Sequence, residues 1–251
     1  MEKIFIKNKN GEKLAGVFHK VNDKKAVVII CHGWPGSKDR KLIKSISEKL
    51  EENNINSFRF DFSGHGESEG KFEDATVSKE KDDLNSIIKH FKEKDYKISL
   101  IGHSTGSLII VIYASENKNS NFLISISSQS ETKNSLNNYD KEQQEKIKNN
   151  EFVYYNEKRY GTKFKVFPKF FEDISTYNAL ELVKKITCPK LFIHGSEDKS
   201  LNPKESQDYY ENAEEPKEIK IIEGADHNFT DEKHLNEMID YCVNWIKGIN
   251  R

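Results

Sequence analysis

Short apolar runs recur along the chain, and between them apolar residues return at helical spacing. Runs that are almost continuously apolar and bounded by turn residues are typical of strands buried on both faces of a parallel sheet. Runs of this kind occupy residues 25–33, 97–103, 121–128 and 188–195. The sequence therefore predicts four central strands, and residues 55–62 and 217–227 indicate two more.

The segments between these strands carry helical patterns. In residues 38–53 the apolar side chains recur three and four positions apart, which gives one apolar face. Residues 76–94 begin with Thr76 and Ser78, either of which could cap a helix N-terminus. We predict helices over residues 38–53, 76–94, 105–114 and 231–247.

The first strands differ from the rest. Asn10-Gly11 lies between two strand-like runs, and this dipeptide is a strong signal for a β-hairpin. After the hairpin, strand and helix alternate from about residue 25 onward. The pattern predicts an α/β fold: a mostly parallel, doubly wound sheet that begins with an N-terminal antiparallel hairpin.

Residues 129–178 break the alternation. They begin very polar and then become rich in aromatic residues: Phe152, Tyr154, Tyr155, Tyr160, Phe164, Phe167, Phe170, Phe171 and Tyr177. Because a structureless loop of this length would be unusual, we interpret the segment as an inserted lid subdomain. The core would then comprise residues 1–128 and 179–251. The aromatic residues either form the lid's own core or line a substrate pocket, for which Tyr154, Tyr155, Phe164 and Phe167 are the candidates.

The composition of the chain argues against several classes of function. Lysine and arginine total 40 and aspartate and glutamate total 41, so nothing favours a nucleic acid or an anionic membrane as a partner. The three cysteines, Cys31, Cys188 and Cys242, are too few and too scattered for a disulfide framework or a zinc site. No apolar signal region and no run long enough to span a bilayer is visible. We expect a cytoplasmic protein.

One motif contains a candidate nucleophile. In "LIGHSTGSLIIVIYASE", Ser104 lies between Gly102 and Gly106, after a strand and before a helix. A turn this sharp strains the central residue and requires small neighbours two positions away on either side. It would lift the hydroxyl of Ser104 clear of the sheet, at the edge where open parallel sheets bind ligands. A glycine-rich turn with an ordinary capping serine is the alternative.

A nucleophilic serine needs a base. Of the eight histidines, His227 alone lies in a loop at the carboxyl end of a predicted strand, facing the same edge as Ser104. His103 adjoins Ser104 in sequence, so we expect its side chain to point to the opposite face.

The base in turn needs an orienting carboxylate. Asp198 follows another strand at the same edge, with Glu197 as its rival and Asp226 as a weaker third candidate. An oxyanion also needs donors, and the glycine-bracketed loop "CHGWPGSK" offers the amide of Trp34 beside that of Thr105.

With these residues in place, the chain resembles the α/β-hydrolase superfamily over most of its length. "HGWPGS", "DFSGHGES", "GHSTG", "HGSEDKSLNP" and "EGADHNF" occur in the order of that family. The nearest likeness is to cinnamoyl or feruloyl esterases and serine-aminopeptidase-like hydrolases. The resemblance implies Ser104 as nucleophile, His227 as general base, Asp198 as its orienting carboxylate, Trp34 and Thr105 as oxyanion donors, and a structural role for the stretch that begins at Asp61.

The sequence thus predicts a serine hydrolase that cleaves a small-molecule carboxylic ester, acyl or aryl and including hydroxycinnamoyl, through an acyl-enzyme. The chemistry requires no metal and no cofactor. A thioesterase or peptidase on the same scaffold and a non-catalytic ligand receptor of hydrolase fold are the alternatives. The oligomeric state stays open, a homodimer included.

Overall fold

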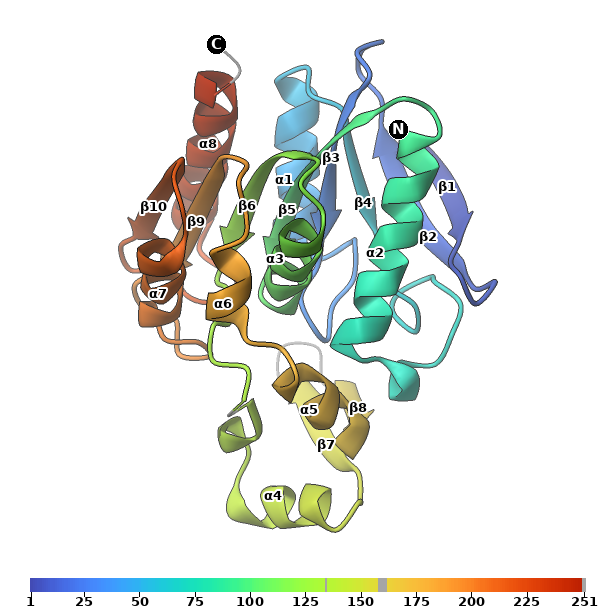
Figure 1. Ribbon diagram of the computed structural model, residues 1–251, viewed down its shortest axis with the longest axis vertical. Helices are drawn as coiled ribbons and strands as arrows, with labels where there is room; N and C mark the ends of the chain where they lie inside the picture. The colour runs from blue at the N-terminus through green and yellow to red at the C-terminus, as the bar shows by residue number, and fades with distance from the viewer. Residues whose placement is uncertain (134, 158–161, 250–251) are drawn as a thin grey trace.

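Eight strands form one sheet in the computed structural model, which describes residues 1–133, 135–157 and 162–249 (Figure 1). The order across the sheet is β1-β2-β4-β3-β5-β6-β9-β10. The strands span Glu2–Lys7 (β1), Lys13–His19 (β2), Ala26–Cys31 (β3), Ser57–Phe60 (β4), Lys97–His103 (β5), Ser120–Ile126 (β6), Lys190–Gly195 (β9) and Lys217–Ile222 (β10). From β4 to β10 every neighbouring pair is parallel, whereas β1–β2 and β2–β4 are antiparallel. The expected sheet and its N-terminal hairpin are confirmed.

Helices cover both faces of the sheet. One face packs against α1 and α8, and the other against α2, α3, α6 and α7 (Figure 1). The helices span Lys41–Glu52 (α1), Val77–Lys92 (α2), Thr105–Glu116 (α3), Ala179–Val183 (α6), Lys204–Asn212 (α7) and Glu232–Ile249 (α8). Strand β3 shows why its sequence is apolar throughout: Val27, Ile29 and Cys31 join one apolar cluster, while alternate residues of the strand join the other.

The four predicted helices are present, and the structure adds two helices against the sheet, α6 and α7, that were not predicted. Thr76, rather than Ser78, caps α2, because its side chain accepts a hydrogen bond from the Lys79 amide. Helix α7 escapes prediction from the sequence. It is polar, and only Ser206 and Tyr209 are buried, so no apolar face marks it.

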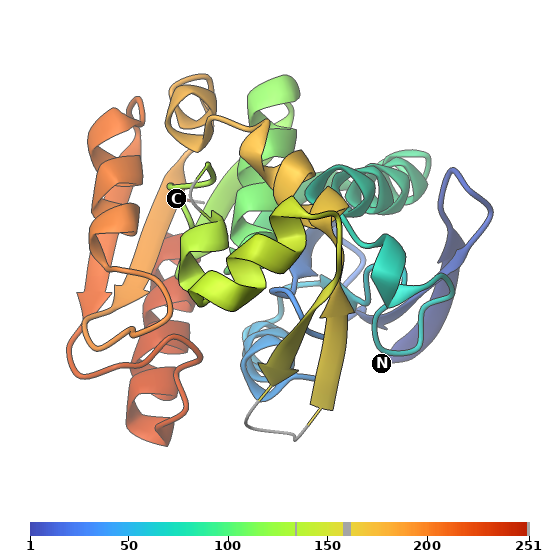
Figure 2. The ribbon, with the colours of Figure 1, turned by 90° about the horizontal axis from the view of Figure 1, so that it is seen from below.

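Residues 129–178 lie beyond the carboxyl ends of the strands (Figures 1 and 2). The segment contains a short 3₁₀ helix, a short α-helix, a two-stranded sheet and a further helix: Ser135–Asn138 (η2), Lys141–Lys148 (α4), Val153–Glu157 (β7), Thr162–Val166 (β8) and Pro168–Ser175 (α5). Of its aromatic residues, Tyr160 lies outside the described part of the chain. Phe170 and Phe171 are buried in the same apolar cluster as α2 and α3, so the segment shares a core with the sheet's helices. Its interpretation as a lid stays a prediction.

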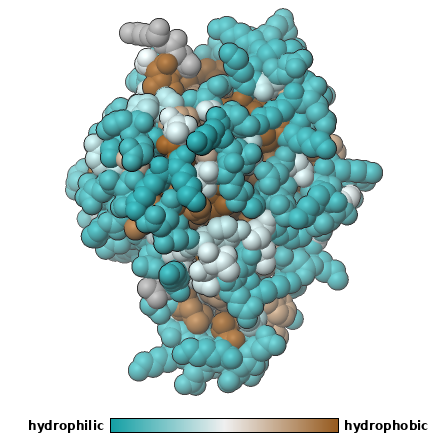
Figure 3. Space-filling view, viewed as in Figure 1, coloured by the Kyte–Doolittle hydropathy of each residue, from teal (hydrophilic) through white to brown (hydrophobic). Residues whose placement is uncertain are grey.

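Polar contacts also fix this segment to the sheet's helices. The amide and the hydroxyl of Ser78, at the start of α2, donate to the carboxylate of Asp173 on α5. The Ser78 hydroxyl also lies 2.7 Å from that of Tyr177. On the face seen in Figure 3, hydrophilic residues cover most of the surface, and hydrophobic ones show in small separate patches, some of them in the inserted segment. Among the described residues, no helix combines the length and the apolar character that crossing a membrane would need.

Candidate active site

Ser104 occupies the sharp turn between β5 and α3. Its backbone angles, φ 54° and ψ −123°, lie in a region that residues other than glycine rarely adopt. Gly102 and Gly106 have no room for a side chain: a Cβ at Gly102 would lie 2.5 Å from the Gly106 carbonyl oxygen, and one at Gly106 would lie 2.4 Å from that of His32. The glycines therefore permit the close approach of strand, helix and neighbouring loop that the turn needs.

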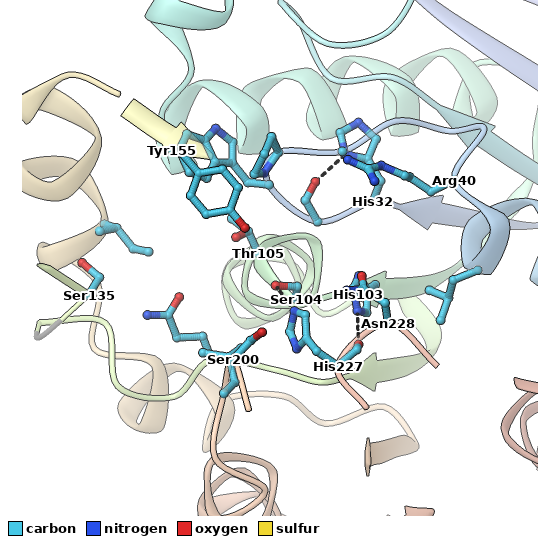
Figure 4. A pocket seen from close by; sticks show the side chains of 18 of the residues that line it. His32, Arg40, His103, Ser104, Thr105, Ser135, Tyr155, Ser200, His227 and Asn228 are labelled. Carbon is cyan, nitrogen blue, oxygen red and sulfur yellow. Dashed lines mark hydrogen bonds between the residues drawn. The ribbon is translucent and has the colours of Figure 1, made fainter. Parts of the chain in front are cut away.

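Two other loops at the same edge of the sheet bring His227 and Asp198 to Ser104, and the imidazole of His227 points at the serine (Figure 4). The Nε2 atom of His227 lies 3.2 Å from the Ser104 hydroxyl, and its Nδ1 atom lies 2.7 Å from Oδ2 of Asp198. Since a carboxylate only accepts, Nδ1 carries the proton and Nε2 is left as the acceptor facing the serine. This tautomer can take a proton from the hydroxyl.

Four donors surround the Asp198 carboxylate. Oδ1 accepts hydrogen bonds from the amides of Ser200 and Leu201, at 2.8 and 2.9 Å. Oδ2 accepts from His227 and from a second histidine, His194, whose Nε2 lies 2.9 Å away. Burial alone would raise the pKa of Asp198, but the hydrogen bonds from His194 and His227 hold it well below its usual range. The group is a fixed anion at neutral pH.

The rival carboxylates lie elsewhere. Glu197 is exposed, and Asp226 accepts hydrogen bonds from Asn228 and Thr230 of its own loop. Neither side chain has a hydrogen bond to His227 in the part of the chain that the structure describes.

His103 takes a position that the sequence does not indicate. Expected to point away from the site, its buried ring instead packs beside that of His227, and its Nε2 donates to the His227 carbonyl oxygen at 2.8 Å. Burial, together with the neighbouring His227, lowers the pKa of His103 to about 3, so the ring is neutral at working pH. The expectation was wrong because the loop of His227 folds back over the strand end and meets the ring there.

Two backbone amides belong to the segments that adjoin the serine. Thr105 begins α3, where the first amides have no partner within the helix, and Trp34 follows β3. The two loops touch, because a Cβ at Gly33 would lie 2.9 Å from that of Ser104. Neither amide donates to any residue that the structure describes. Trp34 and Thr105 line the same cavity as Ser104.

A buried ion cluster holds the loop that carries Trp34. Lys38 is 1% exposed, and its ammonium donates to the carboxylates of Asp61 at 2.8 Å and Glu67 at 2.6 Å. Asp61 also accepts from the Lys38 amide at 2.6 Å. Burial opposes the charge on Lys38, but these hydrogen bonds raise its pKa above the usual range. The stretch beginning at Asp61 thus contacts the candidate oxyanion loop from behind.

A cavity of about 580 Å³ opens above Ser104. Much of its aromatic lining comes from the inserted segment, from which Tyr155 points toward Thr105 (Figure 4). The aromatic lining comprises Trp34, Tyr139, Tyr155, Phe170 and Phe171. Trp34 stacks on Phe170 with ring centroids 4.2 Å apart. The cavity can hold an aromatic or branched apolar group directly over the serine.

Of the four residues predicted to contact substrate, Tyr155 lines this cavity and the other three do not. Tyr154 follows the strand alternation of β7 to the opposite side and is 45% exposed. Phe164 pairs with Tyr155 across β7–β8 but packs on Phe72, outside the cavity. Phe167 packs on Phe152. Their expected places are taken by Tyr139, Phe170 and Phe171, which no feature of the local sequence distinguishes from the neighbouring aromatic residues.

The charged groups of the lining are all basic. Arg40 and Lys199 contribute to the cavity wall, and no aspartate or glutamate does so among the described residues. No cluster of histidine, cysteine or acidic side chains suited to a metal ion occurs within the same described ranges. The cavity can bind a neutral or anionic group, whereas an ammonium group would find no countercharge on its wall.

The doubly wound sheet, the strained serine turn and the Ser104–His227–Asp198 hydrogen-bond chain together define an α/β hydrolase. The family model for serine aminopeptidase S33 matches residues 22–149 and 130–234. The chain belongs to this family of hydrolases. Among curated proteins, no sequence matches it.

Solved structures share the fold over nearly the whole chain. Est1E from Butyrivibrio proteoclasticus, determined with bound ferulic acid, is 24% identical with a TM-score of 0.85, covering 98% of each chain. The mouse α/β hydrolase domain-containing protein 10 is 20% identical with a TM-score of 0.83, covering 99% of this chain and 100% of its own. The Pyrococcus furiosus esterase Pf2001 is 23% identical with a TM-score of 0.74, covering 98% of this chain and 91% of its own. At these identities the likeness concerns the fold.

Proposed function

We propose that this hydrolase cleaves small-molecule carboxylic esters through an acyl-enzyme formed on Ser104. The observation that carries the proposal is the hydrogen-bond chain from the Ser104 hydroxyl through His227 to Asp198, at 3.2 and 2.7 Å. Such a chain activates a hydroxyl that would otherwise be a weak nucleophile.

The reaction proceeds in two halves. Ser104 attacks the ester carbonyl while His227 takes its proton, and the amides of Trp34 and Thr105 stabilise the resulting oxyanion. His227 then gives the proton to the departing alcohol, which leaves an acyl group on Ser104. Water, deprotonated by His227, attacks the acyl carbonyl; the bond to Ser104 then breaks, His227 returns the proton to the serine oxygen, and the carboxylic acid leaves. Throughout, Asp198 keeps His227 in the productive tautomer and stabilises its charged form.

The cavity supports an acyl group with an aromatic ring. Tyr139, Tyr155 and Phe171 form a wall that would stack on such a ring, and Est1E, which shares the fold, was solved with ferulic acid bound. We therefore include hydroxycinnamoyl esters among the substrates. An aminopeptidase must bind a free α-ammonium group, and the basic lining of the cavity favours an ester instead.

The direct test is hydrolysis of p-nitrophenyl acetate and butyrate by the wild type and by Ser104→Ala. We expect the substitution to reduce kcat by roughly four or more orders of magnitude while leaving the melting temperature within a few degrees. Residual turnover within a factor of about ten of the wild type would refute Ser104 as the nucleophile. A wild type inactive on all aryl, alkyl and thioester substrates would instead favour a ligand receptor.

A further inference from the structure

Two histidines, His194 and His227, donate hydrogen bonds to the Asp198 carboxylate, and the proposed mechanism uses only His227. His194, the fifth residue of β9, is fully buried. Its Nε2 lies 2.9 Å from Oδ2 of Asp198 and 3.2 Å from the Leu201 carbonyl oxygen. Both atoms are acceptors, so Nε2 must carry a proton and point it at them.

The other nitrogen of His194 is also occupied. Its Nδ1 lies 2.7 Å from the hydroxyl of Ser206, which is fully buried in α7. The neutral ring can accept a hydrogen bond from the serine hydroxyl at Nδ1 while donating from Nε2, so Ser206 stabilises the tautomer that serves Asp198. A continuous chain of hydrogen bonds thus runs from Ser206 through His194, Asp198 and His227 to Ser104.

We infer that His194 is a positioning residue for the proposed hydrolysis: its Nε2–H holds the Asp198 carboxylate in place and shares the charge of Oδ2 with His227. This inference rests on the proposed function for its kinetic consequences, but the hydrogen-bond arrangement stands by itself. The role is distinct from that of a general base, because His194 is not part of the cavity lining and contacts no reacting atom.

Because His194 and His227 share Oδ2 of Asp198, losing the His194 donor should move the pH profile in a predictable direction. Negative charge on Asp198 favours the protonated form of His227, and a second donor on the same oxygen draws part of that charge away. Loss of the His194 donor should therefore keep His227 protonated to higher pH. Because the free base is the active form, the acidic limb of the kcat/KM profile should move upward. Among the described residues, His103 and Glu205 also interact electrostatically with His194, and neither is altered in the variants below.

Two amide substitutions separate positioning from packing. The side-chain amide of His194→Gln extends to the place of Nε2 and can still donate to Asp198, whereas that of His194→Asn reaches only the place of Nδ1, beside Ser206. We expect His194→Asn to move the midpoint of the acidic limb upward by about half a pH unit and to lower kcat roughly tenfold or more. The His194→Gln enzyme should keep the wild-type midpoint and most of kcat.

A matched control tests whether losing any buried histidine has this effect. His19 on β2 is also fully buried and pairs with Glu51, far from the serine. His19→Asn should lower the melting temperature but leave the midpoint of the acidic limb of the kcat/KM profile unchanged. Rates are divided by the concentration of active sites, which is measured by titration with a fluorophosphonate. A pH profile of His194→Asn that coincides with the wild type, or equal shifts in His194→Gln and His194→Asn, would overturn the inference.

A measurement on the wild type keeps the inference testable if His194→Asn does not fold or if no ester proves to be a substrate. In ¹⁵N-histidine-labelled protein, NMR should show His194 protonated at Nε2 and His227 protonated at Nδ1 near neutral pH. Both N–H protons should be displaced downfield by their bond to one carboxylate, and both of these downfield signals should be lost in Asp198→Asn. A His194 ring protonated at Nδ1 alone would contradict the assignment.

Discussion

At the scale of single residues, the site depends on which carboxylate His227 faces. Asp198 holds His227 Nδ1 at 2.7 Å, whereas Glu197, its neighbour in sequence, is exposed. An amide at position 198 would donate to Nδ1 as readily as it accepts, and this would favour the tautomer with its proton on the serine side.

Asp198→Asn should therefore lower kcat by roughly three to four orders of magnitude, while Glu197→Gln should leave it within about twofold. The measurement is steady-state hydrolysis of p-nitrophenyl butyrate by both variants, with circular dichroism as the check of folding. The opposite ranking would transfer the role to Glu197.

The residues of the serine–histidine–carboxylate chain could be proposed from sequence because strand ends and loops could be located by pattern. Gly102 and Gly106 around Ser104, and two loops at the carboxyl ends of later strands, were sufficient. His103 and His194 could not be given roles in this way. Each lies in an ordinary glycine-containing strand end, and its importance comes from contacts with residues that follow later in the chain, 124 positions away for His103 and His227.

At the scale of elements, the loop after β3 is held by a buried ion cluster as well as by the stacking of Trp34 on Phe170. The Lys38 ammonium and the Asp61 carboxylate are both buried, 2.8 Å apart, behind the loop that presents the Trp34 amide. Removing one partner leaves the other as an unpaired buried charge, which is far more costly than the pair is stabilising.

Lys38→Met should lower the free energy of unfolding by about 3–5 kcal/mol and reduce kcat more than it changes KM, because the amide of Trp34 loses its fixed position. Urea denaturation and steady-state kinetics measure the two effects. Lys41→Met, which breaks an exposed pair with Glu232, serves as the control and should change stability by less than about 1 kcal/mol. Equal effects of the two substitutions would refute the role of the buried cluster.

Because adjacent residues of β7 point to opposite sides, Tyr155 and Tyr154 form a matched pair for substitution. Tyr155 lines the cavity, and Tyr154 points to the other side and is 45% exposed. Tyr155→Ala should raise KM for a hydroxycinnamoyl or naphthyl ester several-fold and change that for an acetate little. Tyr154→Ala should affect neither. A loss on acetate equal to that on the larger ester would indicate that Tyr155 is needed for packing.

The sequence predicts most elements but not the lining of the cavity. Apolar periodicity marks β3 and α1 clearly, because each buries a regular set of side chains. In residues 129–178 the aromatic residues are too closely spaced for one period to stand out. Which of them face the cavity depends on the register of β7 and β8, where a shift of one residue exchanges the two faces.

At the scale of the whole molecule, buried histidines make stability depend on pH. Burial lowers the pKa of His32 to about 4 and those of His65 and His103 to about 3, below the unfolded value of 6.5. Between about pH 6.5 and 4 the unfolded chain binds protons that the folded protein does not. Stability is therefore complete above the unfolded value and falls as the pH is lowered through this window.

We expect the free energy of unfolding to fall by up to about 1.4 kcal/mol per pH unit for each of these histidines across that window. His65→Gln should reduce the slope of the free energy of unfolding against pH by the contribution of one buried histidine. Urea titrations at several pH values between about 4 and 8 measure the slope. Parallel curves for the wild type and His65→Gln would contradict the burial of a neutral ring.

The central claim is that residues distant in sequence make the Ser104 hydroxyl uniquely reactive. Its most direct test is the intact mass of the protein after exposure to a fluorophosphonate probe, followed by peptide mapping. One probe per chain should be found on the peptide that contains Ser104, and labelling should fall by orders of magnitude in His227→Ala, folded to the same extent. Label spread over several serines, or Ser104 labelled equally fast without the imidazole, would contradict the account.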